Sequence, residues 1–467
     1  MNELTYDELK FPNYVNSNTA IRLRAKVGEP ELDREGKDAR PLKTLELTLS
    51  DVVYAAELAG LNMLFVSDSG RGKTQLTSDV AWHHYGGDQE TGQANWADGR
   101  PSFDITDLFE RTRVDLDSGK FDSDTARQVK EERVKRLFFG VDEINRAPGP
   151  KQNEFFDLAD GKYTFNGKRL NLGEDGYALF MATANLNKLN GDFSGTFELD
   201  RALLNRAHLT FDLDHPNFRP TPEDEMVIEE RKANPKVDLA PAQDLTGKIL
   251  TINKKILTAA KQLDPYFTAF RFLVGRGLDY CDTDNYKEKG AAFPMLCNEC
   301  GYTGKDLCSM IKGSSERSIP AVKTLAYALS YLAELKLGEK VEIDPLDAVL
   351  QAFRFTTYHG NLNELVAQEE YAARNQTMMD ETVEKLSGVV NTLRDYLPMM
   401  IAGQDPTIIS YQFQGNRVKA PKDQKTVQAL NKANISFQET NLKKELKEKG
   451  LGVDWVDPYV KRMKELK

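Results

Sequence analysis

The chain has 467 residues, of which 40% are apolar and 29% are charged, and its formal net charge is −10. This length allows two or three domains with buried cores. The acidic balance argues against broad coating of nucleic acid, because such binding depends on lysine and arginine displacing counterions from phosphates. No stretch approaches the roughly 20 apolar residues that span a bilayer, and no secretory leader is evident, so we expect a cytoplasmic protein.

Residues 1–43 are polar and irregular, and we expect an arm there rather than a domain. Over residues 44–215, apolar blocks alternate with amphipathic stretches. Strands that alternate with helices are typical of a wound α/β domain with a parallel sheet. The strand candidates are Asn62–Val66, Leu137–Val141, Leu179–Ala184 and His208–Leu213.

A proline-rich passage between Asp214 and Lys248 interrupts this alternation, so we place a domain boundary at residue 216. Apolar residues at helical spacing dominate the remainder. We therefore expect an α-helical lid over residues 216–340, with a cysteine-rich insertion at 281–308. A helical C-terminal extension is expected over residues 341–467.

The strongest motif is Ser67–Thr74, with the sequence SDSGRGKT, which follows the apolar run NMLFV and precedes an amphipathic stretch. A strand, a glycine-rich loop and a helix in this order form the phosphate-binding Walker A motif, although its usual first glycine is Ser67 here. Lys73 would reach the β and γ phosphates of ATP, and Thr74 would ligate Mg²⁺. Backbone N–H groups of the loop would cradle the phosphates. The expected nucleotide-binding residues are Ser69, Gly70, Arg71, Gly72, Lys73, Thr74, Gln75 and Asp142.

A second motif, RLFFGVDEINRAP (Arg136–Pro148), is an apolar strand that ends in two adjacent carboxylates. Burying acidic residues there is costly without a cation. We expect Asp142 to hold Mg²⁺ and Glu143 to orient or deprotonate the attacking water, which predicts hydrolysis as well as binding. Asn185 follows the strand Leu179–Ala184 and would hold the attacking water or the γ-phosphate, although an asparagine after a strand is more often only a turn residue.

These motifs together resemble the MoxR family of AAA+ ATPases, over Leu47–Leu335. The similarity is most specific in DEINRAPGPKQNEFFDLADGKYTFNGKRLNL and the following LFMATANLN, with a hairpin whose turn is Asn166-Gly167. The resemblance implies an AAA+ P-loop NTPase core, a helical lid and a ring that is expected to be a hexamer. It also implies that Asn185 is the residue called sensor 1. A weaker match, Asp107–Phe121, falls where the family carries its helix-2 insert.

The same resemblance assigns roles to arginines. The segment Gly195–Phe211 aligns with the family's arginine-finger segment and places the finger on Arg206, which would point at the γ-phosphate of a neighbouring subunit. Arg201 is the alternative finger, and both could instead be ordinary surface arginines. The segment Gly313–Leu332 resembles the part of the lid that carries sensor 2, which would be Arg317.

All four cysteines fall between Cys281 and Cys308. Cys297 and Cys300 form C-x-x-C followed by glycine, a spacing typical of a zinc knuckle, and the outer two could complete a structural Zn²⁺ site. Such a site would stabilise a small insertion in the lid, and it is not a typical part of the MoxR pattern. The alternative is four thiols in a loop, because the outer spacings are irregular for zinc.

We interpret the chain as an ATPase that acts as a chaperone, remodelling or assembly factor on a protein client. By resemblance, such proteins often act with a partner that contains a von Willebrand factor A domain. This chain has no D-x-S-x-S motif, so that partner would be a separate polypeptide. The alternative is a nucleic-acid motor of the same clade, helicase-like or restriction-type, which the acidic charge disfavours. The hairpin residues Lys162, Lys168 and Arg169 could nevertheless line a cationic pore.

Overall fold

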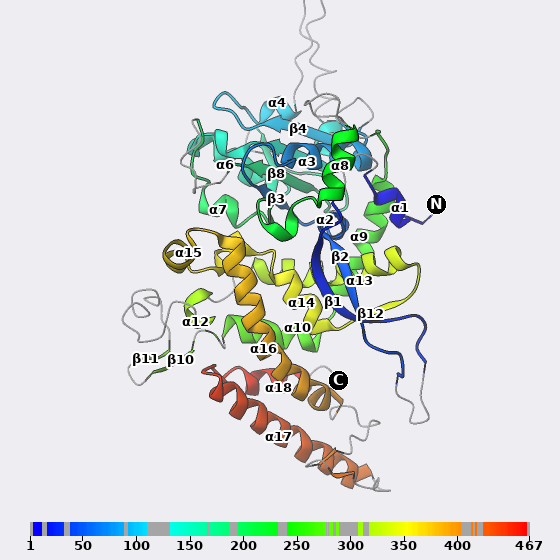
Figure 1. Cartoon of the computed structure of the whole chain (residues 1–467), viewed down its shortest axis with the longest axis vertical. Coiled ribbons are helices and arrows are strands. Elements are labelled where there is room, and N and C mark those ends of the chain that lie inside the picture. The colour runs from blue at the N-terminus through cyan, green and yellow to red at the C-terminus, as the bar shows by residue number, and fades with distance from the viewer. Residues whose placement is uncertain are drawn as a thin grey trace, which may run out of the picture. The chain divides into compact units, whose positions relative to one another are not determined.

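The computed structural model divides into two compact units, and Figure 1 labels many of their elements. The first unit comprises residues 1–261, 320–344 and 355–359, and the second comprises 262–319, 345–354 and 360–467. The structure describes residues 3–11, 16–31, 38–87, 92–109, 131–165, 168–185, 195–231, 241–276, 278, 280–283, 286–288, 307–311, 317–402, 412–413, 416–417 and 424–464. Within these residues, no helix is long and apolar enough to cross a membrane.

The first unit contains a parallel sheet whose described strands lie in the order β4-β5-β8-β3-β9. Strands β3 and β8 are buried along their whole length, as expected when both faces of a parallel sheet are covered. The predicted α/β fold class with a parallel sheet is confirmed. The strands are β3 (Met63–Val66), β4 (Ala94–Asp98), β5 (Phe138–Asp142), β8 (Leu179–Ala184) and β9 (Leu209–Asp212).

The sequence analysis missed β4, because its five residues, ANWAD, include two polar side chains. Asn95 is nevertheless buried, and its amide nitrogen donates a hydrogen bond to the carbonyl oxygen of Arg133 at 2.9 Å. A buried amide that is satisfied in this way costs little, so tertiary contacts override the polar sequence at this strand.

Helices pack on the sheet of the first unit. Helix α3 contacts β5 and β8, and α6 contacts β8. Phe155 of α6 stacks on Phe103 with ring centroids 4.9 Å apart, inside a core that also contains Phe139 of β5 and Phe180 of β8. The helices are α1 (Tyr6–Leu9), α2 (Leu49–Leu58), α3 (Lys73–Tyr85), α4 (Thr106–Phe109), α6 (Gly149–Ala159), α7 (Arg201–Leu204), α8 (Pro222–Arg231) and α9 (Thr246–Lys261), with 3₁₀ turns η1 (Ile144–Arg146) and η2 (Pro216–Phe218).

A second sheet corrects the expectation of an irregular arm over residues 1–43. Strand β1 (Thr19–Val27) pairs antiparallel with β2 (Lys43–Thr48) and with β12 (Val341–Ile343). Ile21, Leu23 and Ala25 are buried and alternate with charged residues, which is a strand signal that the sequence analysis passed over. Because β12 pairs with β1, residues 320–344 belong to the first unit, whereas the sequence analysis places them in the lid and the C-terminal extension.

The second unit is mainly helical, so the predicted helical C-terminal region is present. Arg394 of α16 pairs with Asp347 of α14 at 2.7 Å, and Arg354 pairs with Asp380 of α16 at 2.5 Å. The elements are α10 (Pro265–Gly275), α12 (Leu307–Met310), α14 (Pro345–Phe353), α15 (Glu364–Tyr371), α16 (Asn375–Ala402), α17 (Gln424–Glu448), α18 (Val456–Lys464), the strand pairs β10 (Tyr280–Thr283) with β11 (Tyr286–Glu288) and β13 (Gln412–Phe413) with β14 (Asn416–Arg417), and two elements that the units share, α13 (Ser318–Leu337) and the π-helix η4 (Thr357–Asn361).

The first described residues lie against the far end of α3. His84 is fully buried: its Nδ1 lies 2.9 Å from both carboxylate oxygens of Glu57, and its Nε2 lies 3.0 Å from the carbonyl oxygen of Leu9. The ring of Phe11 packs on His83 and His84. These contacts give both histidines a structural role.

Candidate functional site

The loop between β3 and α3 has the backbone of a phosphate-binding turn. Gly70 and Gly72 have φ angles of 77° and 81°, in the left-handed region that favours glycine. Gly72 directly precedes α3, so the helix begins at Lys73 with its N-terminal N–H groups facing the loop. A helix N-terminus after a glycine-rich turn is a ready-made anion site.

The amine of Lys73 is folded onto this loop. Its Nζ donates to the carbonyl oxygens of Ser67 at 3.0 Å and Asp68 at 2.8 Å, and it lies 2.9 Å from the Ser67 Oγ. Burial lowers the pKa of Lys73 below its ordinary value. Ser67, which replaces the usual first glycine, therefore provides two of the three oxygens that hold the amine.

Thr74 and Asp142 meet at the edge of the sheet where β5 ends. The Thr74 hydroxyl lies 3.0 and 3.1 Å from the two carboxylate oxygens of Asp142. A hydroxyl and a carboxylate are hard oxygen donors, which suit Mg²⁺ together with phosphate oxygens and water. The donor set therefore fits the predicted magnesium ion.

Glu143 lies next to Asn185. The amide nitrogen of Asn185 donates to the Glu143 Oε1 at 3.1 Å. Arg146, which was not among the predicted site residues, contacts both oxygens of the same carboxylate, with its Nη2 3.0 Å from Oε1 and its Nε 2.7 Å from Oε2. Glu143 is also a non-glycine residue with φ 48°, a conformation that costs of order 1–3 kcal/mol and is concentrated at functional sites.

Two buried residues of the site were missed. Thr183 contacts both Asp142 and Glu143. Asn145 holds the backbone of Asn185: its Nδ2 donates to the Asn185 carbonyl at 2.9 Å, and its Oδ1 accepts from the Asn185 N–H at 3.3 Å. A signal for Thr183 was available, because residues two apart on a strand face the same side and Asn185 comes two positions later.

The end of β9 also contacts the phosphate loop. The Oδ2 of Asp214 accepts from the backbone N–H of Asp68 at 2.6 Å, and its Oδ1 lies 3.2 Å from the Nε of Arg71. Asp214 therefore holds the loop at its first half, from a position 146 residues away along the chain. The sequence analysis did not include Asp214 in the site.

Asp212, the last residue of β9, allows a test of the electrostatics beside Asp214. Burial raises its pKa from 3.8 to about 6, and the nearby charge of Asp214 adds to the effect. The folded state therefore binds the proton more tightly than the unfolded state, and stability falls as the pH rises through this window. Asp212→Asn should raise the free energy of unfolding near neutral pH, by at most about 3 kcal/mol. Urea denaturation should show this gain shrinking to nothing toward pH 4, and an equal gain at both pH values would contradict the assignment.

No protein-family model matches this chain, and no curated protein matches it. Solved structures align with part of this chain. A candidate ATPase of Cytophaga hutchinsonii aligns with a TM-score of 0.47 and 17% identity, over 71% of this chain and 88% of that protein. A full-length MCM homolog of Methanopyrus kandleri aligns with a TM-score of 0.37 and 14% identity, over 68% of this chain and 56% of the homolog. Both likenesses are too distant to show function, which must be inferred from the site residues themselves.

Of the three predicted arginines, Arg206 has the best defined surroundings. Its Nε lies 3.1 Å from a carboxylate oxygen of Asp160, its Nη1 donates to the carbonyl oxygen of Ala202, and the guanidinium lies over the ring of Phe156. Only 18% of its side chain is exposed. Arg201, the alternative finger, begins α7 and is exposed. The finger assignment stays a prediction.

The contacts of three predicted site residues do not by themselves indicate a role in nucleotide binding. Arg317 is exposed directly before α13 and belongs to the second unit. The side chain of Gln75 donates to Asp79 on its own helix at 2.9 Å. The backbone N–H of Ser69 donates to the side chain of Asp68 at 2.9 Å. A contact of the Gln75 side chain, or of the Ser69 backbone N–H, with nucleotide would therefore require these bonds to change.

The predicted hairpin forms. Strands β6 (Lys162–Phe165) and β7 (Lys168–Asn171) pair antiparallel, with Phe165 opposite Lys168. This register leaves two residues for the turn, as expected for Asn166-Gly167, which itself lies outside the described residues. Most of the weaker match Asp107–Phe121 also lies outside them.

The zinc prediction falls largely outside the described residues. Cys297 and Cys300 are not among them, while Cys281 lies in β10 and Cys308 in α12, where it is partly buried. Within the described part of the chain, no group of three or more histidine, cysteine, aspartate or glutamate residues could hold a metal ion. The structure therefore gives no support for zinc.

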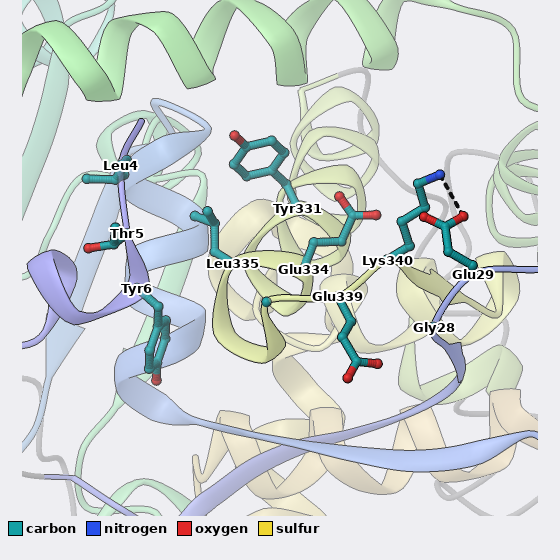
Figure 2. Close-up of a pocket in the computed structure, with 11 residues that line it drawn as sticks. Leu4, Thr5, Tyr6, Gly28, Glu29, Tyr331, Glu334, Leu335, Glu339 and Lys340 are labelled. Carbon is teal, nitrogen blue, oxygen red and sulfur yellow. Dashed lines mark hydrogen bonds and ion pairs between the residues drawn. The ribbon is translucent and has the colours of Figure 1, made fainter. Parts of the chain in front are cut away.

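A separate hollow of about 770 Å³ lies in the first unit. Figure 2 shows the residues that line it, which come from the first described residues, the end of β1 and the end of α13. Three glutamates line it, and one of them, Glu29, pairs with Lys340 at 2.9 Å. No residue of Ser67–Thr74 is among its lining residues. The hollow is therefore distinct from the nucleotide site.

Proposed function

We propose that this chain is an AAA+ ATPase that hydrolyses ATP. The proposal rests on one observation: a single edge of the parallel sheet brings together the loop that holds Lys73, the Thr74–Asp142 pair, and Glu143 beside Asn185. Glycines at positive φ, a buried lysine and two carboxylates at strand ends are the groups that phosphoryl transfer to water requires. They come from three segments that are far apart in the sequence, Ser67–Thr74, Asp142–Glu143 and Asn185, and the fold brings these together.

In this proposal each group has one task. Lys73 exchanges the carbonyl oxygens of Ser67 and Asp68 for oxygens of the β and γ phosphates. Thr74 and Asp142 would hold Mg²⁺, which would neutralise phosphate charge. Asn185 orients the attacking water or the γ-phosphate.

Glu143 takes the proton of the attacking water. Both of its oxygens contact Arg146 in the structure, so hydrolysis requires this ion pair to open at least in part. The pair is accessible enough to do so, because 52% of the Arg146 side chain and 32% of the Glu143 side chain are exposed.

At a finer level, we propose a MoxR-like remodelling or assembly factor that works as a ring, with a hexamer as the expected form, on a protein client in the cytoplasm. The motif series from the phosphate loop to Arg206 supports this reading, and so does the β6-β7 hairpin directly after α6. A partner with a von Willebrand factor A domain would be a separate polypeptide. Arg206 would act on the nucleotide of the neighbouring subunit.

Two measurements test the proposal. The purified chain should release phosphate from ATP when Mg²⁺ is present and not when it is chelated. Affinity capture with Glu143→Gln, which should stay bound to ATP, should retain a protein client that Lys73→Ala loses. Nucleic acid in place of a protein client would instead support a motor of the same clade.

The cysteine cluster carries a prediction of its own, based on the spacing around Cys297 and Cys300. We expect the purified protein to contain about one zinc per chain, because four thiolates form a closed tetrahedral site. Elemental analysis measures this content, and the double variant Cys297→Ser, Cys300→Ser serves as the control that should lose the metal. If protein prepared without chelator contained no zinc, the predicted zinc site would be wrong.

A further inference from the structure

Thr183 lies where the strand of the acidic pair and the strand of Asn185 run side by side. In the register of β5 and β8, Val141 is opposite Ala182, so the next position places Thr183 beside Asp142. Thr183 is 1% exposed, although it carries a hydroxyl group. A buried hydroxyl needs hydrogen-bond partners, and here both partners belong to the site.

The directions of the two hydrogen bonds follow from chemistry. The backbone N–H of Glu143 can only donate, so the Thr183 Oγ1 accepts from it, at 2.8 Å. The single hydroxyl proton is then directed to the Oδ1 of Asp142, at 2.5 Å. One hydroxyl group thus contacts both members of the acidic pair.

Each contact constrains a different part of the site. The bond to Asp142 orients the carboxylate that also contacts Thr74. The bond to the Glu143 N–H holds the residue at which the backbone turns to φ 48°. A non-glycine residue keeps such a conformation only when its surroundings hold it there.

We propose that Thr183 is a positioning residue that sets the direction of both carboxylates, Asp142 toward Mg²⁺ and Glu143 toward the attacking water. This inference rests on the proposed ATPase function and deepens it. Groups that orient metal ligands typically change metal affinity or activity by 10–100-fold when they are mutated. A hydroxyl that only filled a buried space would change stability and leave both properties intact.

The experiment compares Thr183→Val, which keeps the shape and removes the hydroxyl, with Thr183→Ser, which keeps the hydroxyl. The matched control is Thr210→Val, a threonine on β9 of the same sheet that is also 1% exposed. Thr183→Val should lower kcat by about 10–100-fold, with little change in KM. Thr183→Ser and Thr210→Val should retain nearly the wild-type kcat.

Binding of a non-hydrolysable ATP analogue gives a second readout that does not depend on turnover. In chelator, Thr183→Val and the wild type should bind the analogue equally well. The gain in affinity on adding Mg²⁺ should be smaller in Thr183→Val by about tenfold. Circular dichroism checks the fold, and if Thr183→Val fails to fold, Thr183→Ala replaces it.

Three results would overturn the positioning role: wild-type kcat in Thr183→Val, a folded Thr183→Ser as slow as Thr183→Val, or an equal Mg²⁺ gain in Thr183→Val and the wild type. A wild-type chain that hydrolyses no ATP would defeat the proposed function instead. The Mg²⁺ gain would then still decide the role of Thr183, so the two failures are distinguishable.

Discussion

Lys73→Ala should abolish nucleotide binding, whereas Glu143→Gln should bind ATP and fail to turn it over. The amine of Lys73 is buried in the loop, and its removal leaves the phosphates without their cation. Glu143→Gln is nearly isosteric and can keep its contact with Asn185, but it has lost the base. We expect kcat to fall by roughly 10²–10⁴, the usual contribution of a general base.

Calorimetric titration with ATP and a phosphate-release assay separate the two effects. Lys135→Ala, at an exposed lysine, is the control for the loss of a positive charge. Thermal unfolding of the variants checks that each is folded. Equal loss of ATP binding in Lys73→Ala and Glu143→Gln would show that the roles are wrongly assigned.

Arg206→Ala should preserve ATP binding and lower the rate of hydrolysis by roughly 10³ or more, the usual effect of removing an arginine finger. Lys73 would bind the nucleotide of its own subunit. The charge that develops on the γ-phosphate during hydrolysis needs a further cation. Because Arg206 would supply it from the neighbouring subunit, activity per subunit should rise with protein concentration. Arg201→Ala, the matched control at the start of α7, should have a much smaller effect.

The contacts of Arg206 require a control for stability in this test. The side chain packs on Phe156 and pairs with Asp160, so its removal can also destabilise the chain. Arg206→Lys keeps the charge but not the planar fork, and it should restore only part of the rate. Circular dichroism and analytical ultracentrifugation should show that each variant is folded and assembled to the same extent as the wild type.

Mixing the two inactive variants distinguishes a finger that acts in trans from one that acts in cis. A mixed assembly of Glu143→Gln and Arg206→Ala contains interfaces where an intact Glu143 on one subunit meets an intact Arg206 from its neighbour. Partial recovery of ATPase activity is the expected result. No recovery, despite demonstrated mixed assembly, would count against action in trans.

Local sequence was sufficient for the parts of the site that neighbouring residues build together. The phosphate loop depends on glycines, a lysine and a threonine within eight consecutive positions, Ser67–Thr74, between a strand and a helix. The acidic pair is recognisable because Asp142 and Glu143 directly follow an apolar strand. The α/β alternation likewise predicted four of the five described strands of the parallel sheet, because buried strands are short apolar runs.

The tertiary structure decided which distant residues complete these parts. Thr183 and Asp142 are 41 positions apart, and only the pairing of β5 with β8 brings them into contact. Asp214 reaches the phosphate loop because β9 lies beside β3. Strand β12 pairs with β1 although residues 262–319 of the second unit precede β12 in the sequence. The order and register of strands are set by long-range packing, which the local periodicity of a sequence does not encode. The sequence by itself therefore determined the chemistry of the loop and of the acidic pair, and the fold determined the residues that orient them.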